Sequence, residues 1–123
     1  MLDHLSIQCA DVERSKAFYD AVLAPIGGTR VMDFGEVVGY GTEFPDFWVG
    51  PQQTGEGFRE SHIAFRAPSR DAVDAFQRAA VDFGMELLHA ARVWPEYHPG
   101  YYGAFVRDPD GNNVEAVHHT FEV

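Results

Sequence analysis

Polar and apolar residues alternate along eight short stretches of the chain, and two longer stretches carry apolar residues at helical spacing. Alternation is typical of strands with one buried face. The predicted strands span residues 2–9, 30–34, 37–41, 46–50, 61–67, 85–93, 101–107 and 112–118. Helices are predicted after Asp11 and Ser69, which are good N-caps, ending near Ala24 and at Gly84.

The two halves of the chain repeat the same order of elements. The same spacing separates His4 from His62, in the two opening strands, and Phe18 from Phe76, in the two helices. This shared offset indicates a duplicated unit of one strand, one helix and three strands. We therefore expect an α+β fold in which one domain contains two βαβββ modules, residues 1–50 and 61–119, joined by a Gly- and Gln-rich linker at 51–60.

Composition narrows the class of protein. The chain has 123 residues, 46% of them hydrophobic, which suffices for a folded core without disulfides. The net charge of −10 disfavours nucleic acid and anionic membrane surfaces as partners. Because Cys9 is the single cysteine and no apolar leader or membrane-spanning run is present, we expect a cytoplasmic protein.

Three side chains suggest a metal site. His4 and His62 occupy equivalent places in the two modules, on the strand face opposite the helix-packing face. Glu115 lies on the face of the last strand opposite the packing residues Val114 and Ala116, and a carboxylate in this apolar stretch is costly to bury unless it is paired or bound to a cation. Together the three predict a divalent-metal site with open positions for water and substrate, although each alone has an ordinary structural interpretation.

The sequence resembles the vicinal oxygen chelate superfamily, which includes glyoxalases, bleomycin-resistance proteins, extradiol dioxygenases and fosfomycin-resistance thiol transferases. The resemblance is carried by residues 2–7, 15–19, 61–65 and 105–115, above all by the Asp-Pro-Asp-Gly-Asn stretch that precedes Glu115. It implies two βαβββ modules in a partly open mixed β barrel with flanking helices. It also implies His4, His62 and Glu115 as the metal ligands.

One position departs from the pattern of glyoxalase I, which has a fourth, carboxylate ligand on the last strand of the first module. Aligning residues 47–49 with 114–116 puts Trp48 there, and indole cannot bind a metal; a shift of two residues would bring in Asp46. The site therefore looks more like the two-His, one-carboxylate site of the dioxygenases or thiol transferases. Such a site favours Fe²⁺, while Mn²⁺, Ni²⁺, Co²⁺ and Zn²⁺ also fit.

The aromatic segment 94–102 supplies further candidates. His98 carries an imidazole, the type of side chain that commonly transfers protons in enzymes, and Tyr101 could bond a metal-bound oxygen, so both are candidate catalytic residues. A structural cap over the barrel mouth explains the segment equally well. Candidate substrate-binding residues are Trp48, Arg66, Tyr97, Tyr102 and Asn113. For Arg66 the alternative is a salt bridge to one of the many carboxylates.

We therefore expect a small metal-dependent enzyme whose metal binds a vicinal-oxygen substrate, with dioxygenase-like or lyase/isomerase-like chemistry. One alternative is a bleomycin-resistance type of protein that sequesters a cationic small molecule, which suits the acidic, aromatic chain. A further alternative is thiol transfer to an epoxide antibiotic. A homodimer is expected, and in it His4 of one subunit could join His62 and Glu115 of the other.

Overall fold

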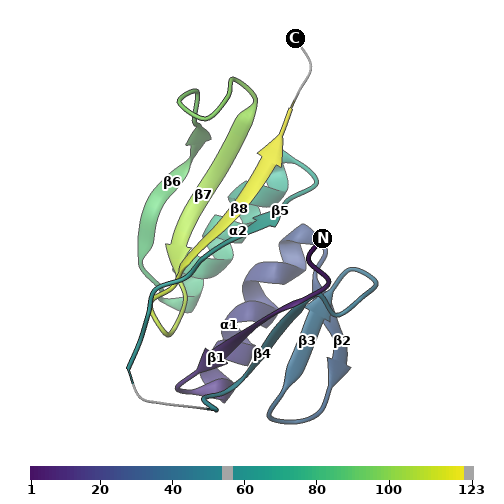
Figure 1. The fold of residues 1–123 in the computed structure, drawn as a ribbon. Helices are drawn as coiled ribbons and strands as arrows, with labels where there is room; N and C mark the ends of the chain where they lie inside the picture. The colour runs from purple at the N-terminus through teal and green to yellow at the C-terminus, as the bar shows by residue number, and fades with distance from the viewer. Residues whose placement is uncertain (54–56, 121–123) are drawn as a thin grey trace.

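The computed structural model describes residues 1–53 and 57–120, and in them the predicted repeat is present (Figure 1). The first module contains β1 (Leu5–Cys9), α1 (Val12–Leu23), a short 3₁₀ helix η1 (Ala24–Ile26), β2 (Thr29–Asp33), β3 (Val38–Gly41) and β4 (Phe47–Pro51). The second contains β5 (His62–Arg66), α2 (Arg70–Phe83), β6 (Leu87–Val93), β7 (Tyr101–Arg107) and β8 (Asn113–His119). The predicted linker thus begins inside β4, and its residues 54–56 lie outside the described residues.

Each module forms one four-stranded mixed sheet, and the two sheets have the same topology. The strand orders are β1-β4-β3-β2 and β5-β8-β7-β6, with the first pair parallel and the others antiparallel. The registers also correspond, because Ser6 lies opposite Trp48 and Ala64 lies opposite Glu115. This confirms the duplicated βαβββ fold and the alignment that places Trp48 where the second module has Glu115.

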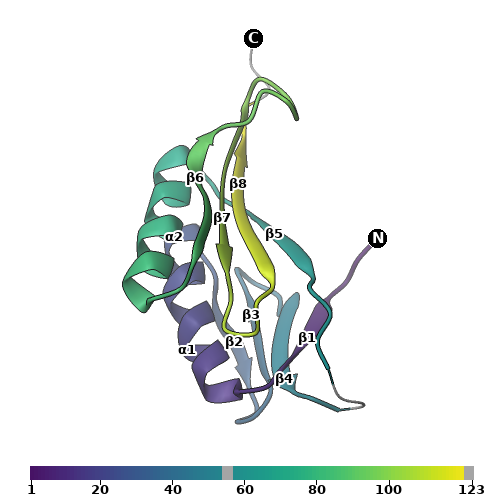
Figure 2. The ribbon, with the colours of Figure 1, turned by 90° about the vertical axis from the view of Figure 1, so that its left-hand side faces the viewer.

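Both helices cover the same side of the sheets. In Figure 2, α1 and α2 lie next to each other on one side, and no helix covers the opposite face. Residues from both modules, among them Phe18, Val22, Val73 and Phe76, are fully buried in one continuous apolar core. The opposite sheet face is therefore the one on which polar side chains can gather. No helix in the described part of the chain is long and apolar enough to cross a membrane.

The predicted helix caps are confirmed. The Asp11 side chain accepts a hydrogen bond from the Arg14 N–H at 3.1 Å, and the Ser69 hydroxyl accepts one from the Ala72 N–H at 3.0 Å. Gly84 ends α2 with φ +97°, a left-handed conformation that glycine adopts without strain.

Several predicted strand ends are wrong by one to three residues. The strand-end error that affects a candidate metal ligand most is in the first strand. Pairing begins at Leu5, so His4 precedes β1 rather than lying inside it. The parallel register continued backwards would need the Asp46 N–H to donate to Asp3, but this N–H donates to the Phe44 carbonyl at 2.9 Å instead. In the second module β6 likewise starts at Leu87 rather than at residue 85.

The turn between β7 and β8 joins the second module to the first. The hydroxyl of Tyr19, in α1, donates to Asp108 Oδ2 at 2.7 Å, and Asp108 is 1% exposed. The N–H of Ala10, which follows β1, donates to Asp110 Oδ1 at 2.9 Å. The Asp-Pro-Asp-Gly-Asn stretch is therefore a hydrogen-bonded contact between modules as well as a turn.

Candidate metal-binding site

Glu115 is the centre of the polar cluster on the open face of the second sheet. Its side chain is almost entirely buried, with the residue 1% exposed, although it lies in the middle of β8. Glu115 Oε1 lies 2.8 Å from His62 Nε2, and Glu115 Oε2 accepts a hydrogen bond from the Tyr101 hydroxyl. Both carboxylate oxygens are thus engaged by groups from the neighbouring strands β5 and β7.

Tyr101 is held in its protonated form. Burial, followed by the hydrogen bond to Glu115 and the charge of that carboxylate, raises the pKa of Tyr101 above its ordinary value. The phenol therefore keeps its proton near neutral pH and presents it to Glu115. A phenol in this state is a hydrogen-bond donor at the centre of the cluster.

His98 and His119 form a hydrogen-bonded pair beside Tyr101. His98 Nε2 lies 2.9 Å from His119 Nδ1, and His98 Nδ1 accepts a bond from the Gly100 N–H at 3.1 Å. The second bond assigns the His98 proton to Nε2, which then donates to His119. Burial, and next the electrostatic influence of His98, lower the pKa of His119, in keeping with a neutral acceptor.

His4 does not join this cluster within the chain. Its Nδ1 lies 2.8 Å from Asp3 Oδ1, and its side chain is 56% exposed. Across residues 1–53 and 57–120, no group of three or more His, Cys, Asp or Glu side chains lies close enough to hold a metal ion. Two of the three predicted ligands, His62 and Glu115, are therefore brought together, and the third is not.

Trp48 lies on the open face of the first module, at the place equivalent to Glu115. Its ring is parallel to that of Phe34, at an interplanar angle of 4° and a centroid distance of 6.2 Å. It also covers Gly39, where an added Cβ would lie 2.9 Å from the indole ring. The glycine therefore makes room for a large aromatic ring where the second module carries a carboxylate.

The other predicted substrate-binding residues divide between the two faces of the sheet. Asn113 stands opposite His62 in the β5–β8 register, and its Oδ1 is the only buried side-chain N or O atom of the described residues without a hydrogen-bond partner. Tyr97 is 59% exposed and stacks on Trp94, close to Tyr101. Tyr102 faces the helices instead, since its hydroxyl donates to Asp74 of α2 at 2.6 Å.

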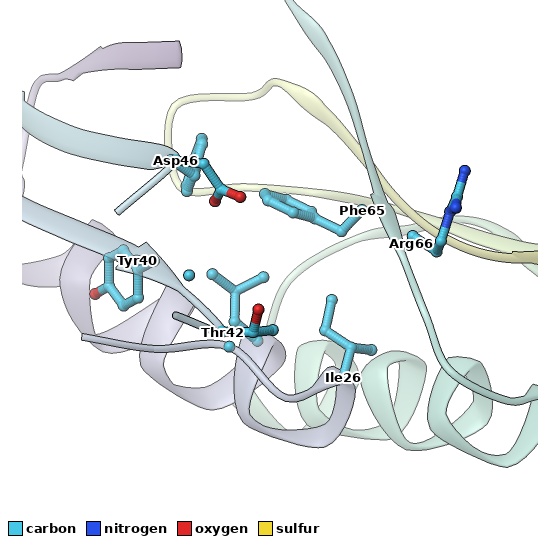
Figure 3. Close-up of a pocket in the computed structure, with 10 residues that line it drawn as sticks. Ile26, Tyr40, Thr42, Asp46, Phe65 and Arg66 are labelled. Atoms are coloured by element: carbon cyan, nitrogen blue, oxygen red, sulfur yellow. The ribbon is translucent and has the colours of Figure 1, made fainter. Parts of the chain in front are cut away.

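Arg66 follows His62 on the same face of β5, two residues beyond Ala64. It lines a hollow of about 240 Å³ at the junction of the modules, together with Ile26, Tyr40, Thr42, Asp46 and Phe65 (Figure 3). Neither His62 nor Glu115 lines this hollow. The hollow therefore adjoins the polar cluster without containing its carboxylate.

His119 is the member of the cluster that the sequence analysis did not assign. The signal for it was present, because the tight turn after β7 sets Arg107 opposite Asn113 and hence Tyr101 opposite His119. Measured along β8 alone, His119 is distant from Glu115, but it lies directly across from the tyrosine that bonds Glu115. Register across a hairpin, rather than distance along one strand, identifies the pair.

Comparisons with known proteins agree with this architecture. The family model described as the Glyoxalase/Bleomycin resistance protein/Dioxygenase superfamily matches residues 1–116. A crystal structure of a glyoxalase/bleomycin resistance protein from Albidiferax ferrireducens is 28% identical, with a TM-score of 0.80 over 95% of this chain and 98% of that one. No curated protein matches the chain.

Two more distant crystal structures share the fold. Lactoylglutathione lyase from Agrobacterium tumefaciens is 20% identical, with a TM-score of 0.67 over 96% of this chain and 92% of that one. A glyoxalase/bleomycin resistance protein/dioxygenase family enzyme from Burkholderia phytofirmans is also 20% identical, with a TM-score of 0.70 over 97% and 98% of the two chains. At this level of identity the likeness concerns the arrangement of strands and helices.

Proposed function

Since the chain belongs to the glyoxalase/bleomycin resistance protein/dioxygenase superfamily, we propose that it is a divalent-metal-dependent enzyme acting on a substrate with two adjacent oxygen atoms. The observation that carries the proposal is Glu115, a carboxylate 1% exposed in the middle of a strand with an imidazole nitrogen 2.8 Å from one oxygen. Burying a carboxylate is costly, and a bound cation would offset more of that cost than His62 and Tyr101 offset by their hydrogen bonds.

The donor set of the second module fits part of a metal site. His62 Nε2 and Glu115 Oε1 are an imidazole nitrogen and a carboxylate oxygen close enough to share one ion. In solution, loading requires His62 to be neutral, so metal affinity falls as the pH is lowered. Fe²⁺ is the ion we favour, with Mn²⁺, Ni²⁺, Co²⁺ and Zn²⁺ as substitutes.

We further propose that His4 completes the site from a second copy of the chain. Within one chain, His4 hydrogen-bonds to Asp3 and lines a hollow with Ser6 and Trp48, apart from Glu115. The open face that carries Glu115 has no helix over it, which leaves room for the first module of a partner (Figure 2). A two-fold dimer of this kind would contain two equivalent sites.

The chain's own residues then have distinct roles. A bound divalent metal would supply Lewis-acid polarisation of the two substrate oxygens. Tyr101 holds a proton next to Glu115 and is placed to donate a hydrogen bond to a ligand oxygen at that position. Tyr101 is the better placed of the two predicted catalytic residues because it contacts Glu115 directly, whereas His98 bonds to His119.

Turnover with restored metal tests the proposal. Metal-depleted protein is reloaded with each of the five ions and assayed for ring cleavage of catechols and for isomerisation of methylglyoxal–thiol adducts. Glu115→Gln should lower kcat/KM by about a hundredfold or more, because it removes a ligand charge. Glu86→Gln, the same change at an exposed residue before β6, should leave it unaltered.

Two results would count against an enzyme of this kind. One is activity that is equal in wild type and Glu115→Gln with every ion. The other is metal-independent binding of cationic ligands without turnover, which would favour the sequestering type of protein.

A further inference from the structure

Arg66 is a cation on the open face that forms no ion pair with any of the described residues. Two other arginines on the strands of this sheet form ion pairs, Arg92 with Glu96 and Arg107 with Glu60. No hydrogen bond or salt bridge within the described residues involves the Arg66 guanidinium, although the chain has nineteen acidic residues and nine basic ones. The salt bridge considered for Arg66 on sequence grounds is therefore not formed.

The acidic group that shares two hollows with Arg66 does not neutralise it. Asp46 lines both the junction hollow and a neighbouring one of about 340 Å³ that His4 and Ala64 also line. Figure 3 shows the Phe65 ring between Asp46 and Arg66, with the guanidinium directed away from Asp46. The cation therefore remains available to a ligand.

Across the sheet from Arg66, the open face carries small or apolar residues, with polar residues to either side of them. Arg66 lies opposite Val117, and Val117 lies opposite Gly103 on the next strand. The two neighbours of Arg66 across the sheet are therefore a valine and a glycine, which are small and apolar. Gly103 adds no side chain to this face, and an added Cβ there would lie 3.2 Å from Glu115 Oε2 and 3.2 Å from the Tyr101 ring. Along β8, Glu115 and His119 are the outward-facing residues before and after Val117.

From this arrangement we infer that Arg66 binds the carboxylate group of an organic ligand whose other end lies at Glu115. Guanidinium binds carboxylates through two parallel hydrogen bonds, and in a chain with a net charge of −10 a local cation favours the binding of an anion. Arg66 is two residues along β5 from Ala64, the partner of Glu115. Measured along the backbone of β5, that spacing is about 7 Å, which a ligand with one six-membered ring and its substituents can span.

The inference rests on the proposed function only for the end of the ligand at Glu115. It narrows the substrate class to compounds that carry adjacent oxygens at one end and a carboxylate about one ring away. The carboxylate contact itself needs no metal. The Arg66–carboxylate contact and the metal-dependent function can therefore be disproved independently.

The Arg66 contact is tested by measuring the affinities of two matched ligands by calorimetry, in protein loaded with Zn²⁺. The probes are 3,4-dihydroxybenzoate and catechol, which differ only in the carboxylate. Wild type should bind the acid about tenfold more tightly or better. Arg66→Gln should abolish this preference without changing the affinity for catechol, and Arg66→Lys should retain part of it. Arg78→Gln, the same charge change at an exposed position on α2, should keep the full preference.

A second pair of ligands tests the Arg66 contact in protein without metal. Metal-free wild type should bind benzoate more tightly than benzamide, and Arg66→Gln should lose that difference. An equal preference in wild type and Arg66→Gln, or no preference in wild type with either pair, would overturn the inference. If the benzoate preference depends on Arg66 while catechol affinity is the same with and without Zn²⁺, the carboxylate contact stands and the metal proposal fails.

Discussion

At the scale of single residues, the structure shows which polar side chains the fold can bury. Glu115 is buried because His62 and Tyr101 satisfy its two oxygens, and Asp108 because Tyr19, Asn112 and two backbone N–H groups satisfy it. Alternation along the strand predicted the direction of Glu115, since neighbouring residues point to opposite faces. The partner of His98 could not be found in this way, because it depends on the pairing of two strands.

Cys9 gives a prediction at this scale. Its side chain faces α1 and is 1% exposed, and burial raises its pKa to about 11. At pH 8 roughly one thiol in a thousand is ionised, and the thiolate is the reactive form. Iodoacetamide should therefore label the folded protein at least about a hundredfold more slowly than the urea-unfolded chain, as followed by mass spectrometry. Equal rates in the two states would show that the thiol is neither buried nor protonated.

At the scale of elements, much of the fold was predictable because its signals are local. Turn residues, caps and alternation identified every strand and both helices, and the repeated spacing of His4 and His62 identified the duplication. The start of β1 was not predictable from its own residues, since it depends on the turn before β4, where the Asp46 N–H donates to Phe44 rather than to β1. Tyr102 was misplaced for a related reason: in an aromatic run, only strand pairing shows which ring faces Glu115 and which faces α2.

At the scale of the whole molecule, the two modules are joined on the helix side and open on the other. The apolar core and the contacts of Asp108 and Asp110 join the modules. The opposite face carries His4 and Trp48 in one module and His62 and Glu115 in the other. This arrangement fixes the modules within a chain while leaving the polar face to a ligand or a second copy.

The contact between Tyr19 and Asp108 should contribute to global stability. Tyr19→Phe leaves a fully buried carboxylate with one donor fewer, which should lower the free energy of unfolding by about 1–3 kcal/mol. Urea denaturation measures the change, provided that the slope with denaturant stays the same. Tyr102→Phe removes a tyrosine–carboxylate bond within the second module that is only partly buried, and should cost about 1 kcal/mol or less. A loss in Tyr19→Phe no larger than that control would show that the intermodule contact adds no stability.

The most direct test of the account is the metal content of mixed subunits. Wild type should bind about one divalent ion per chain, and His4→Ala and Glu115→Gln should each lose tight binding. When the two variants are unfolded and refolded together, random pairing makes half of the dimers mixed, each with one intact site, so the mixture should regain about a quarter of the wild-type metal. Recovery near that level is the result we predict. No metal in wild type, undiminished metal in Glu115→Gln, or no recovery on mixing would contradict a site shared between two copies of the chain.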